Sequence, residues 1–216
     1  MMAILSTKKL KPNQRDLLLA SGNSVVSYDA ISIEYIPFDI PQHIQNAIFT
    51  SQHAVRSIGD KKWPIDRCFC VGEKTKALLE EKGLKVEEMA ENSSELGKII
   101  AKSYEFESFY YFTGNLRREE LPTILKDAKI EYFEVKTYKT TLNVRKFEQK
   151  WDIVLFFSPS GVQSFTAENS LANTTAICIG ETTAAEAKKY TSEVLVSNTT
   201  SVESVIAKTV KTAQTI

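Results

Sequence analysis

The sequence predicts an α/β protein built from two lobes, each containing a parallel sheet. Short apolar runs alternate with helical patterns along the 216 residues, which is typical of parallel strands joined by helices. Two pairs of segments repeat at nearly equal offsets, and a third pair repeats out of order. The alternation predicts the fold class, and the repeats predict that one lobe is inserted into the other.

Eight short apolar runs are the expected strands, at residues 2–5, 31–35, 47–49, 68–71, 109–112, 132–135, 153–157 and 176–179. Seven segments with apolar residues at helical spacing are the expected helices, at residues 52–58, 74–81, 94–101, 117–128, 161–168, 183–190 and 201–211. Most of these helices directly follow a strand. This order favours parallel sheets over antiparallel ones.

Internal duplication is visible in the sequence itself. AIFTSQHAVRSI at 47–58 matches LFFSPSGVQSF at 155–165, and CVGEKTKALLEEKG at 70–83 matches CIGETTAAEAKKYT at 178–191. Gly72 lies 21 residues after Ser51 and Gly180 lies 22 after Ser158, so the two copies have nearly the same internal spacing. A third match joins FYYFTGNLRREELP, which starts at 109, to AILSTKKLKPNQ near the N-terminus.

The third match shows that the two copies are arranged differently along the chain. In the N-terminal copy this unit comes first, and its partner units follow only after residue 150. A domain split by an insertion explains that order. We therefore expect a discontinuous domain and an inserted domain, joined by two linker strands with a ligand cleft between the lobes. The expected ranges are 1–36 plus 142–216 for the first domain, 40–135 for the second, and 36–41 and 136–143 for the linkers.

The composition excludes several classes of protein. Lys+Arg and Asp+Glu both number 27, so the chain lacks the cationic surplus of a general nucleic-acid binder. No apolar run is long enough for a membrane span, and the N-terminal charges follow the apolar stretch, unlike those of a signal peptide. The three cysteines are expected to be buried thiols in strands. We expect a cytoplasmic monomer that binds a small molecule.

The usual catalytic constellations are missing from the sequence. His43 and His53 are the only histidines, and neither accompanies a Gly-x-Ser-x-Gly motif. There is no dinucleotide fingerprint and no P-loop, and Cys68-x-Cys70 lacks the second pair that a zinc site needs. The sequence therefore indicates a reaction or a binding event that depends on shape and hydrogen bonding more than on a metal or a strong nucleophile.

Hydroxyl groups at strand ends are the candidate binding groups. Thr50, Ser51 and Ser158 follow apolar strands, where ligands bind in parallel sheets. The paired motifs Gly-Glu-Lys-Thr at 72–75 and Gly-Glu-Thr-Thr at 180–183 place hydroxyls at helix starts, where an anion is favoured. Plain helix capping explains the same residues equally well. Arg117 and Arg118 could bind carboxylates or could be solvated charges.

Six segments together resemble the uroporphyrinogen-III synthase family. They occur in the expected order and spacing between residue 47 and about 190: IFTSQHAV, CVGEKTKALLEEKG, YFTGNLRREELP, VKTYKT, FFSPSGVQSF and CIGETTAAEA. The resemblance implies two α/β lobes on a two-stranded linker and a cofactor-free enzyme. Its substrate would be hydroxymethylbilane, a linear tetrapyrrole, which closes with loss of water and inversion of ring D.

The resemblance also assigns roles to individual residues. Tyr138 falls on the family's tyrosine, which is proposed to assist departure of the substrate hydroxyl. The positions that would line the substrate site are Thr50, Ser51, Thr75, Ser158, Thr182 and Thr183. At the N-terminus the chain has Ser6-Thr7-Lys8-Lys9 where many members have Thr-Arg-Pro, so a guanidinium contact is lost there. A non-catalytic two-lobe protein that binds an anionic metabolite is the alternative.

Overall fold

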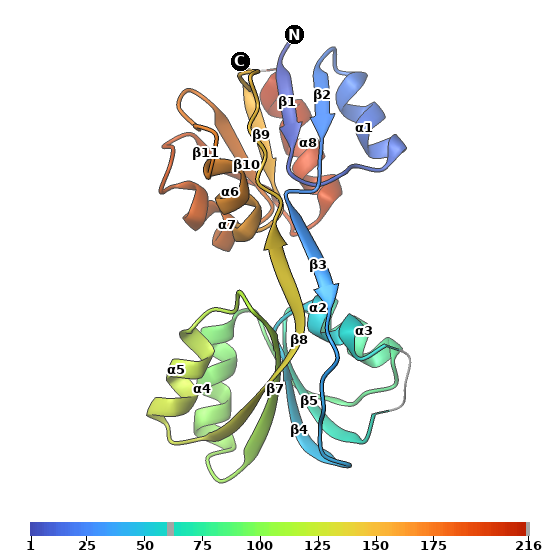
Figure 1. Cartoon of the computed structure of the whole chain (residues 1–216), viewed down its shortest axis with the longest axis vertical. Helices are drawn as coiled ribbons and strands as arrows, with labels where there is room; N and C mark the ends of the chain where they lie inside the picture. Colours follow the sequence, from blue (N-terminus) through green and yellow to red (C-terminus); the bar gives the residue numbers. More distant parts are fainter. Residues whose placement is uncertain (60–62, 215–216) are drawn as a thin grey trace. The chain divides into compact units, whose positions relative to one another are not determined.

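Parallel pairs dominate both sheets, and the chain leaves its first unit and later returns to it (Figure 1). The computed structural model describes residues 1–59 and 63–214. Unit 1 comprises Met1–Ser32 and Thr141–Ile216, and unit 2 comprises Ile33–Thr140. The first crossing therefore lies before the expected 36–41 linker, whereas the second lies within 136–143. Pro37 and Pro41 keep the 36–41 segment out of any strand, because proline has no N–H to pair.

Unit 1 contains a five-stranded sheet in the order β11-β10-β9-β1-β2. Its strands are β1 (Ala3–Ser6), β2 (Ser24–Ser27), β9 (Ile153–Phe156), β10 (Thr175–Cys178) and β11 (Val194–Val196). Its helices are α1 (Pro12–Leu19), α6 (Pro159–Thr166), α7 (Glu181–Ala187) and α8 (Val202–Ala213).

Unit 2 contains most of a six-stranded sheet in the order β3-β8-β7-β4-β5-β6. The strands are β3 (Ile31–Tyr35), β4 (Ile44–Phe49), β5 (Ile65–Val71), β6 (Val86–Ala90), β7 (Ser108–Gly114) and β8 (Glu131–Leu142). The helices are α2 (Gln52–Ser57), α3 (Glu73–Glu81), α4 (Ser93–Ser103) and α5 (Glu120–Asp127). The chain crosses between units inside β3 and inside β8.

The two sheets have equivalent topology, as the internal repeats predict. Strands β11-β10-β9-β1-β2 of unit 1 correspond in order to β6-β5-β4-β7-β8 of unit 2. The repeated sequence segments fall on equivalent elements, namely β9–α6 with β4–α2, β10–α7 with β5–α3, and β1 with β7. The duplication therefore extends from sequence to strand order.

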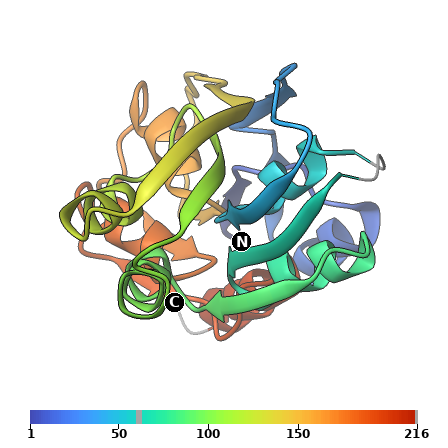
Figure 2. The ribbon, with the colours of Figure 1, turned by 90° about the horizontal axis from the view of Figure 1, so that it is seen from below.

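Each sheet is buried on both faces, which explains its continuous apolar strands. In β9, Val154 and Phe156 pack into a cluster with α6 and α7, whereas Ile153 and Leu155 pack on the other face with α1 and α8. Unit 2 repeats this arrangement, with α2 and α3 covering one face and α4 and α5 the other. Figure 1 shows these helix pairs on opposite sides of their sheets, and Figure 2 views unit 2 from below.

Some elements were not among the strands and helices expected from the sequence. The strands β2, β6 and β11 were not expected because none of them is a long apolar run. Their sequences are Ser-Val-Val-Ser, Val-Glu-Glu-Met-Ala and the three residues Val-Leu-Val. Helix α1 was anticipated only through the N-terminal repeat. Strand β8 is 12 residues long and unites the expected strand at 132–135 with most of the expected linker strand at 136–143. Within β8, Thr137 and Thr140 are buried, whereas Lys136, Lys139 and Thr141 are exposed.

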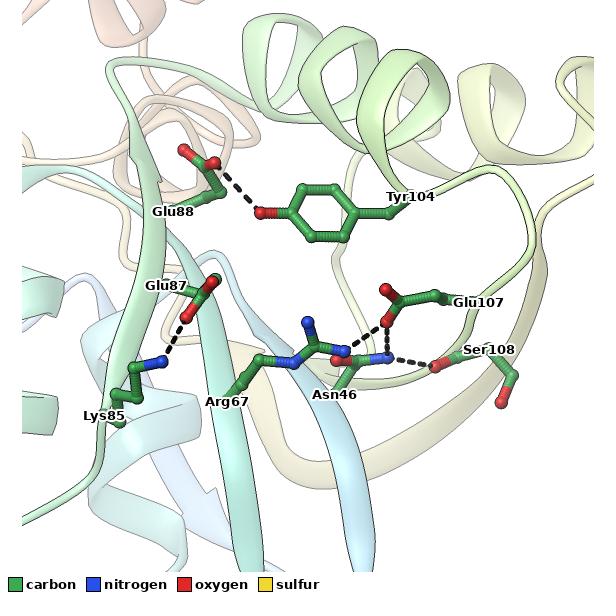
Figure 3. A network of polar contacts seen from close by, with 8 residues as sticks. All are labelled: Asn46, Arg67, Lys85, Glu87, Glu88, Tyr104, Glu107 and Ser108. Carbon is green, nitrogen blue, oxygen red and sulfur yellow. Dashed lines mark hydrogen bonds and ion pairs between the residues drawn. The ribbon is translucent and has the colours of Figure 1, made fainter.

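Ion pairs and amides occupy the amino-terminal edge of the unit 2 sheet (Figure 3). Asn46 is 1% exposed, and its Nδ2 donates to Glu107 Oε2 at 2.7 Å and to the Ser108 carbonyl at 3.0 Å. Arg67 donates to the same carboxylate and lies over the Tyr104 ring. These contacts tie β4 and β5 to the segment that enters β7.

We expect a fragment of residues 33–140 to fold cooperatively by itself. This fragment contains all of unit 2 and the apolar clusters on both faces of its sheet. A fragment of residues 1–110 is the matched comparison, because it lacks α5, β8 and most of β7. Urea unfolding followed by circular dichroism should give a sigmoidal transition for 33–140 alone. A sigmoidal transition for 1–110 and none for 33–140 would contradict this division.

Candidate active site

Serine residues cap the helices that follow the first strand of each repeat. Ser51 ends the turn after β4 and caps α2, where its Oγ accepts from the His53 N–H at 3.1 Å. Ser158 follows β9 and caps α6, where its Oγ accepts from the Gly161 N–H at 3.0 Å. Both hydroxyls use an acceptor lone pair for the cap, so each keeps its own hydrogen for a further acceptor. Capping and ligand binding are therefore compatible here.

The second pair of matching segments, 70–83 and 178–191, places threonines in the first turns of α3 and α7. Thr75 and Thr183 each occupy the third helical position and are 5% and 2% exposed, whereas Thr182 is exposed. The N–H groups of Thr75 and Thr183 donate to the carbonyls of Gly72 and Gly180, at 3.0 and 3.1 Å. Threonine side chains thus lie at the carboxyl edges of both sheets.

The two glycines that precede these threonines have different roles. Gly72 has φ of 83°, in the left-handed region that favours glycine. Gly180 has φ of −174°, an extended conformation that any residue can adopt. The sequence argument for a tight glycine turn therefore applies to the first motif and not to the second.

Acidic residues also lie at these helix starts. Glu73 and Glu181 are the first residues of α3 and α7. Each carboxylate complements the positive end of the helix dipole and so competes with an anionic ligand for that position. Neutral hydroxyl donors are consequently the more available groups on these edges.

A buried tyrosine holds the Thr50 hydroxyl. Thr50 Oγ1 lies 3.0 Å from the hydroxyl of Tyr111, which is only 2% exposed. Burial raises the pKa of the Tyr111 phenol, and hydrogen bonds with Thr50 and Thr113 partly offset this rise. Tyr111 therefore stays neutral near pH 7 and orients Thr50. Tyr111 could not be identified as a site residue from the sequence, because an aromatic residue inside an apolar strand is typical of the core.

Tyr138 lies on β8 against the α2–α3 side of unit 2. It is partly buried and packs on the cluster that contains Phe49, Val55 and Phe112. Its ring centroid is 5.7 Å from that of His53, the second residue of α2. The structure thus brings Tyr138 and His53 together at the carboxyl edge, a contact that the sequence did not predict.

The segment that follows β1 contributes a buried threonine hydroxyl. Thr7 is 5% exposed, and its Oγ1 donates to the Leu155 carbonyl at 2.7 Å. A Cβ on Gly161 would lie 3.3 Å from Ser158 Oγ and 3.4 Å from Thr7 Oγ1, so the two hydroxyls flank the same glycine. Lys8 and Lys9 follow this threonine at the edge of the sheet.

Arg117 is engaged in ion pairs, and the three cysteines are buried. Arg117 pairs with Glu119 at 2.6 Å and with Glu134 at 2.7 Å, which together raise its pKa and use its guanidinium. All three cysteines are free and buried, and burial raises the pKa of Cys68 and Cys178 to about 12 and that of Cys70 to about 11. These thiols are therefore protonated near pH 7 and are poor nucleophiles.

Metal-binding and membrane-spanning features are both missing from the described parts of the chain, 1–59 and 63–214. Within them, no group of three or more His, Cys, Asp or Glu residues is arranged to hold a metal ion. Nor does any helix in these ranges combine the length and apolar character needed to cross a bilayer.

A family model described as uroporphyrinogen-III synthase HemD matches residues 15–207 of the chain. The chain belongs to the uroporphyrinogen-III synthase family. Solved structures have the same fold. Uroporphyrinogen-III synthetase from Helicobacter pylori 26695 is 21% identical with a TM-score of 0.69, covering 98% of this chain and 100% of that one. A mutant uroporphyrinogen III synthase from the extremely thermophilic bacterium Thermus thermophilus is 14% identical with a TM-score of 0.72, covering 99% and 100%. No curated protein matches the sequence.

As a uroporphyrinogen-III synthase family member, the chain carries its candidate residues at the carboxyl edges of two equivalent sheets. Thr50, Ser51 and Thr75 belong to unit 2, and Ser158, Thr182 and Thr183 belong to unit 1. Tyr138 lies in the strand that leaves unit 2. The repeats give each edge the same pattern, a serine cap followed by a threonine in the next helix.

Proposed function

We propose that this chain converts hydroxymethylbilane to uroporphyrinogen III, with loss of water and inversion of ring D, in tetrapyrrole biosynthesis. The observation that carries the proposal is the family match across residues 15–207, which includes every strand of both sheets except β1. The hydroxyl pattern at the two carboxyl edges supports it, because the substrate bears acetate and propionate groups that accept hydrogen bonds.

The reaction needs proton transfer and conformational control. The C–O bond of the substrate's hydroxymethyl group breaks with electrons supplied by the pyrroles, and the hydroxyl leaves as water after taking a proton. We assign that proton to the Tyr138 phenol. The released methylene carbon bonds to the ring D carbon that carries the bridge to ring C, which gives the spiro intermediate. That bridge bond then breaks, and its carbon bonds to the free α carbon of ring D, so the ring is reversed. The pyrrole carbon at which the macrocycle closes finally loses a proton, which restores the phenol, so no redox partner is required.

Uncharged donors would bind the substrate carboxylates. Thr50, Ser51, Thr75, Ser158, Thr182 and Thr183 are the proposed binding residues. Each neutral hydrogen bond contributes only about 1 kcal/mol net, so the carboxylates depend on several donors together. Such distributed binding suits an enzyme whose main task is to hold a flexible chain in one conformation. Three free, buried cysteines fit the cytoplasmic location that we propose.

The proposed activity predicts the isomer of the product. Purified full-length protein given fresh hydroxymethylbilane should release mainly the type III isomer, also after treatment with a chelator. Unassisted closure of the same substrate gives type I, so chromatography of the two isomers measures the enzyme directly. A type I product at the rate of a protein-free control would support the binding-protein alternative and contradict the proposal.

Tyr138→Phe should lower kcat for type III product roughly 10- to 100-fold, within the lower range for general acid catalysis. The substitution keeps the ring against its apolar neighbours and removes only the hydroxyl. Thermal melting should therefore change little, and a Thr75→Val variant should lose less activity because several donors share the carboxylates. An unchanged rate for Tyr138→Phe would remove the phenol from the mechanism.

A further inference from the structure

The ladder between β7 and β8 changes register beside Tyr138. It is regular from Ser108 opposite Glu131 to Thr113 opposite Lys136, and then Gly114 lies opposite Tyr138. Thr137 is the extra residue, so β8 contains a bulge immediately before the tyrosine. Because a shift of one residue exchanges the two faces of a strand, the bulge decides which face the Tyr138 ring takes.

The bulge has a cost that other contacts must offset. Thr137 is fully buried, and its hydroxyl has no hydrogen-bond partner among the residues that the structure describes. A buried hydroxyl without a partner destabilises the folded state. The register shift therefore depends on the residues that face it across the ladder.

Gly114 is one of these residues, and the tyrosine ring covers it. A Cβ at position 114 would lie 2.4 Å from Tyr138 Cε2 and 2.6 Å from Cζ, closer than real contacts allow. Gly114 does not have a positive φ, so its backbone would accept other residues. The requirement for glycine comes from the Tyr138 ring itself.

Asn115 fixes β8 on the far side of the tyrosine. Its Nδ2 donates to the Thr140 carbonyl at 3.0 Å, and its Oδ1 accepts from the Thr140 N–H at 2.6 Å. The Asn115 side chain thus supplies the two hydrogen bonds that a neighbouring strand would otherwise make to β8 at Thr140, two residues beyond Tyr138. The missing side chain of Gly114 lets the Tyr138 ring lie directly on the β7 backbone, and Asn115 holds the β8 backbone beyond Tyr138.

We propose, on the basis of the proton-donor role assigned above to Tyr138, that Gly114 and Asn115 are positioning residues which place its phenol for the reaction. The ring rests on a residue without a side chain, and the strand is clamped immediately after it. A methyl group at 114 would push the hydroxyl away from the leaving group without altering its chemistry.

Gly114→Ala in the full chain tests this placement. We expect kcat for type III product to fall roughly 10- to 100-fold, as misplacement by about 1 Å can do, with KM changed much less. In a Tyr138→Ala background, which removes the ring, Gly114→Ala should change the remaining activity by less than about twofold. Gly97→Ala is the matched control, because its Cβ would meet Ile124 at 3.0 Å, on α5. It should leave kcat unchanged whatever its effect on melting.

A spectroscopic measurement separates this proposal from the proposed function. In protein labelled with 3-fluorotyrosine, the Tyr138 ¹⁹F resonance, identified by its loss in Tyr138→Phe, should move in Gly114→Ala. Asn115→Ala introduces no steric clash. It should move or broaden the same resonance and also lower kcat. It therefore tests the proposal even if Gly114→Ala does not fold. An unmoved resonance in both variants overturns the positioning role. The positioning role is also overturned if the resonance moves but kcat stays unchanged, provided that Tyr138→Phe lowers kcat. An enzyme whose kcat Tyr138→Phe leaves unchanged would instead refute the proton-donor role, whatever the resonance does.

Discussion

The parallel pairing of β1 with β9 is the constraint on which the rest of the structure depends. It places Ile4 opposite Ile153, and Thr7 Oγ1 then donates to the Leu155 carbonyl across a sequence separation of 148 residues. This contact joins the two chain segments of unit 1 into one sheet and leaves Ile33–Thr140 as a continuous insertion. The long loop closure adds little entropic cost when the inserted segment forms its own cores, because that cost grows only logarithmically with loop length.

The topology of both sheets then decides where chemistry can occur. All carboxyl ends of parallel strands lie at one edge, and the repeats fill that edge with serine and threonine residues in each unit. In unit 2 the opposite edge carries the ion pairs and amides of Asn46, Arg67 and Glu107. Charged side chains stabilise one end of that sheet, and neutral donors remain available at the other.

The sequence predicted the features that depend on pattern. Alternation identified the class, and repeats identified the insertion and equivalent positions such as Ser51 and Ser158. It missed β6, an edge strand that contains two glutamates, and it divided the single strand β8 into a strand at 132–135 and a linker strand at 136–143. It could not predict the contact of Gly114 with Tyr138 or that of Tyr111 with Thr50, because these depend on register across the sheet. Local patterns carry no information about a register shift at Thr137.

Hydrogen–deuterium exchange of the wild-type chain with and without uroporphyrinogen III, under anaerobic conditions, tests the central claim most directly. That claim is that the carboxyl edges bind the tetrapyrrole through neutral donors. At saturating product, we predict slower exchange in peptides that cover residues 50–54, 72–76, 158–162 and 180–184. Peptides around Asn46 and Glu107, at the amino-terminal edge, should exchange at unchanged rates. Protection confined to the amino-terminal edge, or absent from all four carboxyl-edge segments, would contradict the account.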